Sequence, residues 1–551
     1  MKIQTSRTKA GATLDFGDFN VFVGGNAVGK TSLVLELYAR AVGLARSKWF
    51  WFDQSTVELH SSDPIADLRL VRDSMALHFE GSNRFYYSQA AKNLEGNTDL
   101  DDNLRIATDE YHYLGRLCDK GHLDDARSQL ANYKHLRCLL SFANCEARLN
   151  LPSQTPVTPL NQPPQDAANV LFRNRTLHAE ISKSVQNHFG FHLALLDHAR
   201  TRIDVGLSAE EPPSFNNMVD DLQVEFSRIE TWKQTNFTPI QDAGHGIRSM
   251  AKLLMTLLEP VNQIIFIDEP EMHLYPAQKR WLGRQLVTLA NVGGKQVFLV
   301  THDPIVLQGV LDTPATTRVF RIDLDSDGGR TVSHCDLTNL DDVGSKRNQD
   351  AYLQALFYRR CIVVEGSADR FFYQAMAEAL HAPRIQDKEL GFIACGGKGA
   401  SKNLCHLACR VGLKPAIIYD FDVLLFDIKV LRDVVTMLHA EAPALGDLER
   451  LLRSDFGLDP KRIKAGTEGA ASQGLGSSFV KRHRDLFDAV LRDLATTGVF
   501  VVPNGTLESW APDVYPKVRF AELAPDHIKK HHELAGPVSD FIDSVLSYIG
   551  C

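Results

Sequence analysis

Residues 363–372 read VVEGSADRFF, an apolar run that ends at Glu365 and gives way to a helical pattern. A second apolar run, IIYDFDVLL at 417–425, ends at Asp420 and Asp422. Strand ends that project carboxylates at one point form a hard, oxygen-lined site, which suits Mg²⁺ or Mn²⁺ better than zinc. The two runs therefore predict an α/β unit with a divalent-metal site, starting near residue 350.

The stretch between these runs, GGKGASKN at 396–403, reads as a turn that leads into a helix. Its two glycines and Lys398 could bind a phosphate through backbone amides, although a tight turn alone would also need the glycines. Asp369 lies one helical turn beyond Glu365, so both could face the same ion. The alternative for Asp369 is an acid at a helix N-terminus, which the helix dipole favours.

A phosphate-binding loop, GGNAVGKTS at 24–32, follows the apolar run 19–23. It matches the pattern G-x-x-x-x-G-K-[ST], in which backbone N–H groups close around phosphates and the next helix adds its positive N-terminus. Lys30 would contact the outer phosphates and Thr31 would ligate Mg²⁺. The order of strand, glycine loop and helix indicates a nucleotide site rather than a plain glycine turn.

Two later runs supply the rest of such a site. In IIFIDEP (264–270), Asp268 stands at a strand end, where it would hold Mg²⁺ through water, and Glu269 would orient the attacking water. In THDP (301–304), His302 stands where a sensor of the γ-phosphate belongs. Apolar runs without alternation fit a parallel sheet that is covered on both faces. Each polar residue alone could be a solvated strand end, but in this order they support one another.

These motifs resemble the Walker A, Walker B with D-loop, and H-loop of ABC-type ATPases of the RecF and SMC sort. The resemblance implies that ATP binds between two heads, each giving a signature motif to its partner's nucleotide. At the expected position stands DAGHGIRSMAKLL (242–254), which lacks the usual serine before the glycines. Gln54 is a candidate for the Q-loop, with a glutamine in a surface loop as the alternative. The implied nucleotide-binding residues are Asn26, Gly29, Lys30, Thr31, Ser32, Gln54, Gly244, Gly246, Arg248 and Asp268.

The acidic motifs resemble a TOPRIM domain, the fold shared by topoisomerases, primases and OLD-family nucleases. That family carries a glutamate after its first strand and a D-x-D after its third, as the two quoted runs do. OLD-like TOPRIM domains place a further acid after a later strand, where TTGVFVVPNGTLESWAPD (496–513) carries Glu508. Lys517 is a candidate cation near the scissile phosphate, with a solvated surface lysine as the alternative. The implied metal ligands, for two ions roughly 4 Å apart, are Glu365, Asp369, Asp420, Asp422 and Glu508.

The composition is that of an ordinary globular protein, with 551 residues, 44% hydrophobic and 23% charged. The net charge of −8 only mildly lowers the expectation of nucleic-acid binding, because an acidic whole can hide a basic groove. The sequence shows no signal peptide or membrane span, so we expect a cytoplasmic protein with reduced cysteines. Cys395, Cys405, His406 and Cys409 invite a zinc interpretation, but their spacing matches no zinc motif, and buried free cysteine is the simpler expectation.

The expected fold is α/β, with two domains. An ABC-type ATPase head would comprise 1–75 and 206–340, interrupted by a helical insertion in 76–205. Amphipathic stretches between 101 and 149 carry the helical prediction, and the family resemblance adds a dimerisation role. A TOPRIM nuclease domain would comprise 341–551, with a second helical insertion near 427–497.

Taken end to end, the order of motifs resembles the OLD family of ATPase–TOPRIM endonucleases, which includes the Gabija nuclease of anti-phage defence. The resemblance implies a nucleotide-regulated DNA endonuclease that uses ATP and Mg²⁺ or Mn²⁺. It also implies a homodimer or homotetramer, and it allows for a second defence-system protein as partner. The alternative is a RecF- or SMC-like DNA-maintenance ATPase whose TOPRIM domain binds DNA without cutting it. The implied catalytic residues are Glu269, His302, Glu365, Asp420 and Lys517.

Overall fold

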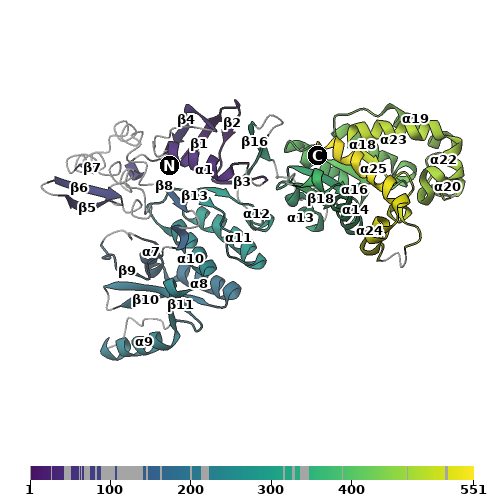
Figure 1. The fold of residues 1–551 in the computed structure, drawn as a ribbon. Helices are drawn as coiled ribbons and strands as arrows, with labels where there is room; N and C mark the ends of the chain where they lie inside the picture. The colour runs from purple at the N-terminus through teal and green to yellow at the C-terminus, as the bar shows by residue number, and fades with distance from the viewer. Residues whose placement is uncertain are drawn as a thin grey trace. The chain divides into compact units, whose positions relative to one another are not determined.

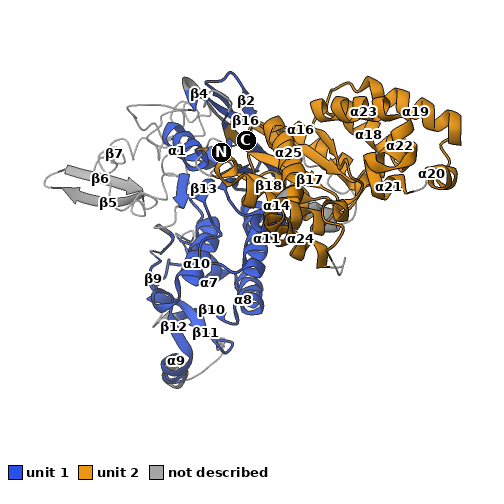
Figure 2. Cartoon of the chain, turned by 45° about the vertical axis from the view of Figure 1, so that its right-hand side comes forward, with its two compact units in different colours: residues 1–23, 29–320, 324–332 blue, residues 24–28, 321–323, 333–551 orange. Residues whose placement is uncertain are grey.

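The chain divides into two units of α/β structure in the computed structural model, and Figure 2 shows them in different colours. Unit 1 comprises residues 1–23, 29–320 and 324–332, and unit 2 comprises residues 24–28, 321–323 and 333–551. The structure describes residues 2–25, 28–41, 51–60, 63, 65–67, 75–80, 83–88, 106–107, 140–143, 147–149, 151–161, 164, 166–198, 201–212, 222–313, 317–324, 329–335, 346–386, 389–467, 469–514 and 519–551.

A six-stranded sheet forms the centre of unit 1 (Figure 1). Its strands lie in the order β16-β15-β3-β14-β13-β8, and the last four of these run parallel to one another. All five residues of β3 and of β14 are buried, as unbroken apolar runs in a doubly covered sheet should be. The bounds are β3 Phe19–Val23, β8 Leu140–Ala143, β13 Ile264–Asp268, β14 Gln296–Val300, β15 Thr317–Leu324 and β16 Arg330–Cys335.

Three helices follow the strands that carry the nucleotide motifs: α1 (Lys30–Ala41) follows β3, α11 (Pro276–Val292) follows β13, and α12 (Pro304–Leu311) follows β14. A proline begins both α11 and α12, where its missing N–H removes no helical hydrogen bond. Each motif therefore lies between the carboxyl end of a strand and the start of a helix.

Three smaller sheets complete the described part of unit 1. Strands β1 (Lys2–Thr8), β2 (Thr13–Asp15) and β4 (Phe52–His60) form one, and β5 (Met75–Glu80), β6 (Asn83–Ser88) and β7 (Ile106–Ala107) form another. The third contains β10 (His192–His198), β11 (Arg202–Ser208), β12 (Phe237–Pro239) and β9 (Gln154–Pro156). The other α-helices among the described residues of unit 1 are α7 (Ala167–Arg173), α8 (Arg175–Phe189), α9 (Leu222–Asn236) and α10 (His245–Leu258).

The expectation of a helical insertion in 76–205 is incomplete. Its described part contains α7 and α8 but also several strands, of which β8 joins the central sheet beside β13. Most of the amphipathic stretch 101–149 lies outside the described residues. The strands were missed because a short apolar run such as LSFA cannot be told from a buried helical segment by periodicity. The proposed domain bounds stay a prediction.

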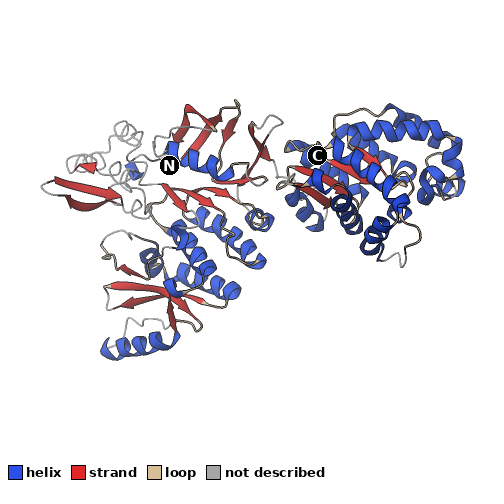
Figure 3. Ribbon diagram, viewed as in Figure 1, coloured by secondary structure: helices blue, strands red, loops and turns tan. Residues whose placement is uncertain are grey.

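Unit 2 is built on a four-stranded parallel sheet in the order β18-β17-β19-β20. Figure 3 draws strands in red and helices in blue. Helix α14 (Ser367–Leu380) follows β17, and α16 (Lys398–Arg410) follows β18. A group of helices between β19 and β20 includes α17 (Val423–Phe426), α18 (Ile428–Met437), α19 (Pro443–Phe456) and α23 (Arg484–Thr497). The strand bounds are β17 Arg360–Val364, β18 Leu390–Ala394, β19 Ala416–Tyr419 and β20 Val499–Val501.

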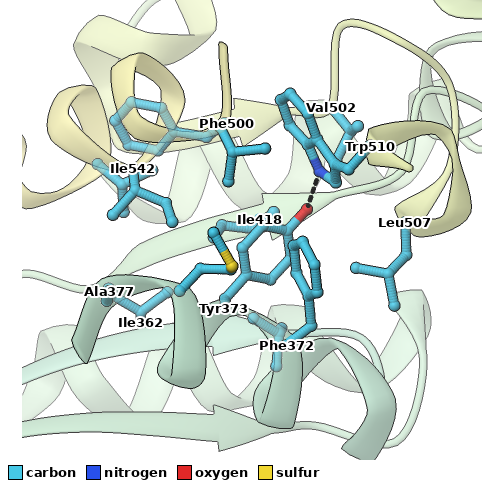
Figure 4. Close-up of a cluster of buried hydrophobic side chains, with 14 of the residues drawn as sticks. Ile362, Phe372, Tyr373, Ala377, Ile418, Phe500, Val502, Leu507, Trp510 and Ile542 are labelled. Carbon is cyan, nitrogen blue, oxygen red and sulfur yellow. Dashed lines mark hydrogen bonds between the residues drawn. The ribbon is translucent and has the colours of Figure 1, made fainter. Parts of the chain in front are cut away.

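Alternate residues of these strands face opposite sides of the sheet. Ile362, Ile418 and Phe500 point into a core that they share with α14, α24 (Phe520–Lys530) and α25 (His532–Tyr548) (Figure 4). The other face lies toward α16, where the hydroxyls of Ser401 and Tyr419 are hydrogen-bonded. A sheet buried on both faces leaves its strand ends as the places where polar side chains can gather.

Candidate nucleotide and metal sites

The phosphate loop needs glycine for geometric reasons. Gly24 has φ 143°, and a Cβ added there would lie 2.2 Å from the carbonyl oxygen of Ile322. Gly29 has φ 94°, a left-handed conformation that side chains rarely adopt, and its Cβ would also crowd Ser32 and Trp51. The indole of Trp51 donates a hydrogen bond to the Ser32 hydroxyl at 2.9 Å, at the start of α1. Asn26 lies outside the described residues.

The Walker A and Walker B motifs meet at one hydrogen bond. The hydroxyl of Thr31 donates to Oδ1 of Asp268 at 3.0 Å. Burial raises the pKa of Asp268, while the bond from Thr31 works in the opposite direction. These two oxygens are the ones expected to hold Mg²⁺, Thr31 directly and Asp268 through water. Lys30, which is buried, begins the same helix.

Glu269 has a strained backbone that neighbouring groups hold in place. Its φ is 48°, in the left-handed region, although it is not glycine. Its N–H donates to the carbonyl of Val300 at 2.9 Å, and its own carbonyl accepts from Nη2 of Arg148 at 2.8 Å. Strain of this kind is often found at functional sites. Arg148 was not anticipated, because it lies in the short 3₁₀ helix η3 (Ala147–Leu149), inside a stretch interpreted as helical.

His302 lies against the side chain of Glu269, with Nε2 3.1 Å from Oε1. Burial and the nearby Lys30 ammonium lower the pKa of His302, so the imidazole is neutral at pH 7. Glu271, a second residue missed from sequence, accepts the backbone N–H of His302 at 2.8 Å. This bond joins the D-loop to the H-loop, and the side chains of the two predicted site residues Glu269 and His302 lie in contact.

The signature-like segment begins α10. Gly244 is the N-cap of this helix, and a Cβ on Gly246 would lie 2.4 Å from the carbonyl oxygen of His273, so this glycine permits a close approach. Arg248 donates to the carbonyl of Gln241 at 3.1 Å. Gln54 lies on strand β4 rather than in a loop, and its side chain is outside the described part of the chain.

The acids of unit 2 gather at the carboxyl ends of its parallel strands. Glu365 directly follows β17, and Asp420 and Asp422 follow β19. The chain passes from β17 to β18 on one side and returns to β19 on the other, so these acids stand at the point where the strand order reverses. Sheets of this kind bind ligands at such a switch point. The backbone N–H of Asp420 donates to Oε1 of Glu365 at 3.3 Å, which joins the two strand ends.

The carboxylates of this group repel one another. Burial, and then the charges of Asp369, Glu365, Asp422 and Glu508, raise the pKa of Asp420 to about 8. Burial also raises the pKa of Glu365 to about 7, although the Lys398 ammonium opposes it. Asp369 likewise has a raised pKa, chiefly from burial, while its Oδ2 accepts the N–H of Gly366 at 2.9 Å. Mutual repulsion among buried acids is what a bound cation would relieve.

The residues present fit a divalent cation in charge and chemistry. Oδ1 of Asp422 is buried and has no hydrogen-bond partner in the described part of the chain. Carboxylate oxygens are the ligands that Mg²⁺ and Mn²⁺ prefer. Among the described residues, no three acidic, histidine or cysteine side chains are already arranged around a single point. The fit is therefore in charge and ligand type, not in a preformed arrangement of ligands among these residues.

Glu508 lies in the 3₁₀ helix η7 (Leu507–Trp510) beyond β20, and its Oε2 accepts the hydroxyl of Thr506 at 2.9 Å. The charge interactions with Asp369 and Asp420 show that the fold brings it to the same group. Lys517 lies outside the described residues. Cys395 and Cys405 are buried, and burial raises the pKa of Cys395 to about 11 and that of Cys405 further, so both thiols are neutral.

Two family models match the chain, one within unit 1 and one within unit 2. A family model described as “AAA domain, putative AbiEii toxin, Type IV TA system” matches residues 119–308, and the model “Overcoming lysogenization defect protein-like, TOPRIM domain” matches residues 356–422. The Old nuclease of Escherichia phage P2 is 26% identical over 200 residues, 33% of each chain. The OLD nuclease of Thermus scotoductus is 24% identical over 259 residues, 44% of this chain and 45% of that protein. The matches span less than half of either relative.

A solved Smc head, bound to the C-winged helix domain of ScpA, aligns with 62% of this chain and 100% of its own at 10% identity. Its TM-score of 0.33 is too low to bear on the fold or the function. None of the described helices is long and apolar enough to cross a membrane.

Fold, sites and matched domains define a P-loop ATPase domain followed by a TOPRIM domain. The domain pair and the relatives named OLD nuclease make the chain similar to the OLD family of ATPase–TOPRIM proteins. The predicted fold class, an ATPase domain followed by TOPRIM, is thereby confirmed.

Proposed function

We propose that this chain is a divalent-metal-dependent DNA endonuclease whose activity is controlled by ATP. The observation that carries the proposal is the group of mutually repelling carboxylates at the switch point of the TOPRIM sheet. Burial and neighbouring charge raise the pKa of Asp420 to about 8 and that of Glu365 to about 7, an arrangement that costs stability without a cation. The relatives named OLD nuclease support DNA as the substrate.

In the proposed mechanism, Glu365, Asp420 and Asp422 would hold one ion, and Asp369 and Glu508 would help to hold a second. Bound Mg²⁺ or Mn²⁺ would supply charge stabilisation and lower the pKa of a coordinated water. The chain itself orients the acids through the backbone bond from Asp420 to Glu365. Lys398, whose ammonium lies beside Asp422, provides a fixed positive charge near the substrate phosphate.

ATP binding and hydrolysis are assigned to the P-loop ATPase domain. Thr31 and Asp268 would hold Mg²⁺, and Glu269 would orient the attacking water, with neutral His302 at its side chain. We place ATP between two heads, because the N-terminus of α10 at Gly244 is exposed and has no side-chain cap. Uncapped backbone N–H groups at a helix N-terminus favour an anion such as a partner's γ-phosphate. The protein is then at least a homodimer.

A supercoiled plasmid assay tests the nuclease proposal. Wild-type protein is incubated with Mg²⁺, Mn²⁺, Ca²⁺ or a chelator, each with and without ATP. We expect nicked or linear product with Mg²⁺ or Mn²⁺ and none with Ca²⁺, whose looser coordination positions the attacking water poorly. DNA that is retarded on a gel but stays uncut under every condition would contradict the proposal and favour a RecF-like role. Loss of plaque protection by Glu365→Gln would separately test the proposed role in anti-phage defence.

A further inference from the structure

A buried hydrogen bond in unit 2 lies close to the acid group, which comprises Glu365, Asp369, Asp420, Asp422 and Glu508. The indole Nε1 of Trp510 donates to the phenol oxygen of Tyr373 at 3.2 Å (Figure 4). Tyr373 is 1% exposed and Trp510 is 3% exposed, inside the core that α14, α24 and α25 share with the sheet. Buried tyrosine and tryptophan normally find a polar partner, and these two find each other.

The bond joins α14, which carries Asp369, to η7, which carries Glu508. Tyr373 lies on α14, one turn beyond Asp369, and residues four apart lie on the same helix face. Trp510 ends η7, two residues beyond Glu508. The residues are 137 positions apart in sequence, so the bond fixes a distance that chain connectivity does not.

The two acids lie on the two sides of this junction, Asp369 on α14 and Glu508 on η7. Each acid is also anchored on its own element, Asp369 by the N–H of Gly366 and Glu508 by the hydroxyl of Thr506. With both side chains anchored, their separation follows the spacing between α14 and η7.

We propose that Tyr373 and Trp510 are positioning residues whose hydrogen bond sets the separation of Asp369 and Glu508, and thereby the affinity for the second divalent ion. The inference rests on the proposed two-ion site. Partners in the outer shell of a metal site orient the ligands and are commonly worth a 10- to 100-fold change in metal affinity.

Metal binding to the full chain, rather than cleavage, tests the inference. Free Mn²⁺ is titrated by electron paramagnetic resonance in wild type, Trp510→Phe, Tyr373→Phe and the double variant, without DNA. Both substitutions keep a ring in the core and remove one partner of the bond. We expect the weaker Mn²⁺ site to lose about tenfold in affinity in either single variant. The double variant should be no worse than the weaker single one, because all three lose the same bond.

Tyr548→Phe is the matched control. Its hydroxyl donates to the carbonyl of Thr497 at 2.9 Å in the same unit, and no acid of the group takes part in that bond. Its Mn²⁺ titration should match wild type. If Trp510→Phe and Tyr373→Phe also match wild type, the inference is overturned. If Trp510→Phe fails to fold, Tyr373→Phe decides alone, since it deletes only one oxygen.

Two more variants separate this inference from the two-ion proposal. Asp369→Asn and Glu508→Gln remove one carboxylate charge each and should abolish the weaker Mn²⁺ site. If they do so while the aromatic variants bind normally, only the positioning inference fails. If wild type binds fewer than two Mn²⁺ ions, or if the two acid variants bind Mn²⁺ as wild type does, the two-ion proposal fails. The positioning inference, which rests on that proposal, then fails as well.

Discussion

The ammonium of Lys398 lies 2.5 Å from Oδ2 of Asp422 and 3.3 Å from Oδ2 of Asp427. Burial alone would lower the pKa of Lys398, but Asp422, Glu365 and Asp427 outweigh it and raise that pKa. The lysine therefore stays charged and partly neutralises the acid group. A bound cation would compete with this ammonium for the same carboxylate.

Removing that competitor should strengthen metal binding. We expect Lys398→Gln to bind Mn²⁺ several-fold more tightly than wild type, because like charges repel across so short a distance. Titration of free Mn²⁺ measures this. Lys402→Gln is the control, since Lys402 lies one turn further along α16 and pairs with Asp433 at 2.7 Å instead. Weaker Mn²⁺ binding by Lys398→Gln would mean that the lysine supports the site rather than competing for it.

The acid group should make the metal-free protein less stable as pH rises. The folded-state pKa of Asp420, about 8, lies above its ordinary value, so the folded chain binds more protons than the unfolded chain between those values. Stability then falls as pH rises through that interval. In chelator, the melting temperature should drop between about pH 6 and about pH 8.5, and Asp420→Asn should show a smaller drop. Equal drops in the two proteins would contradict the assigned charge repulsion.

The control for this comparison is Asp433→Asn. Asp433 has a lowered pKa, chiefly because Lys402 donates to it, and it is half-buried. Its substitution should leave the pH dependence of the melting temperature between these two pH values unchanged. Adding Mn²⁺ should raise the melting temperature of wild type more at the higher pH, where the acids are ionised.

Two substitutions in the nucleotide site should separate ATP binding from ATP hydrolysis. Lys30→Ala should abolish ATP binding, because it removes the ammonium that would contact the outer phosphates. Glu269→Gln should keep binding but slow hydrolysis by about 10²-fold or more, since the residue that orients water contributes on that scale. Binding of a fluorescent ATP analogue and release of phosphate measure the two steps. If Glu269→Gln hydrolyses ATP at the wild-type rate, the Walker B assignment is wrong.

If a partner completes the nucleotide site, as proposed above, the protein should assemble. Light scattering at micromolar concentration should give at least a dimer with ATP present, and closed two-fold symmetry is the common solution. Arg248→Ala should weaken the ATP-dependent part of this assembly. A monomer both with and without ATP would count against a site shared between heads.

The sequence predicts those parts of the site that depend on a short local motif. Glu365 and Asp420 end apolar runs, and parallel strands bring such ends to one edge. Arg148 could not be found in this way, because its partner, the carbonyl of Glu269, is 121 residues distant and leaves no trace in the local pattern. The Trp510–Tyr373 bond and the Lys398–Asp422 pair likewise depend on tertiary packing. Strand β8 was missed for a different reason, since four apolar-rich residues fit a helix as well as a strand.

Cleavage of supercoiled plasmid by Asp420→Asn, compared with wild type and Asp433→Asn in Mg²⁺ and ATP, tests the central claim most directly. A metal ion that stabilises developing charge contributes several kcal/mol to the barrier, so the rate should fall by about 10²- to 10⁴-fold. ATP binding should stay at the wild-type level in both variants, and Asp433→Asn should cut normally. If Asp420→Asn cuts DNA as fast as wild type, the TOPRIM acids are not the nuclease site and the proposed function is wrong.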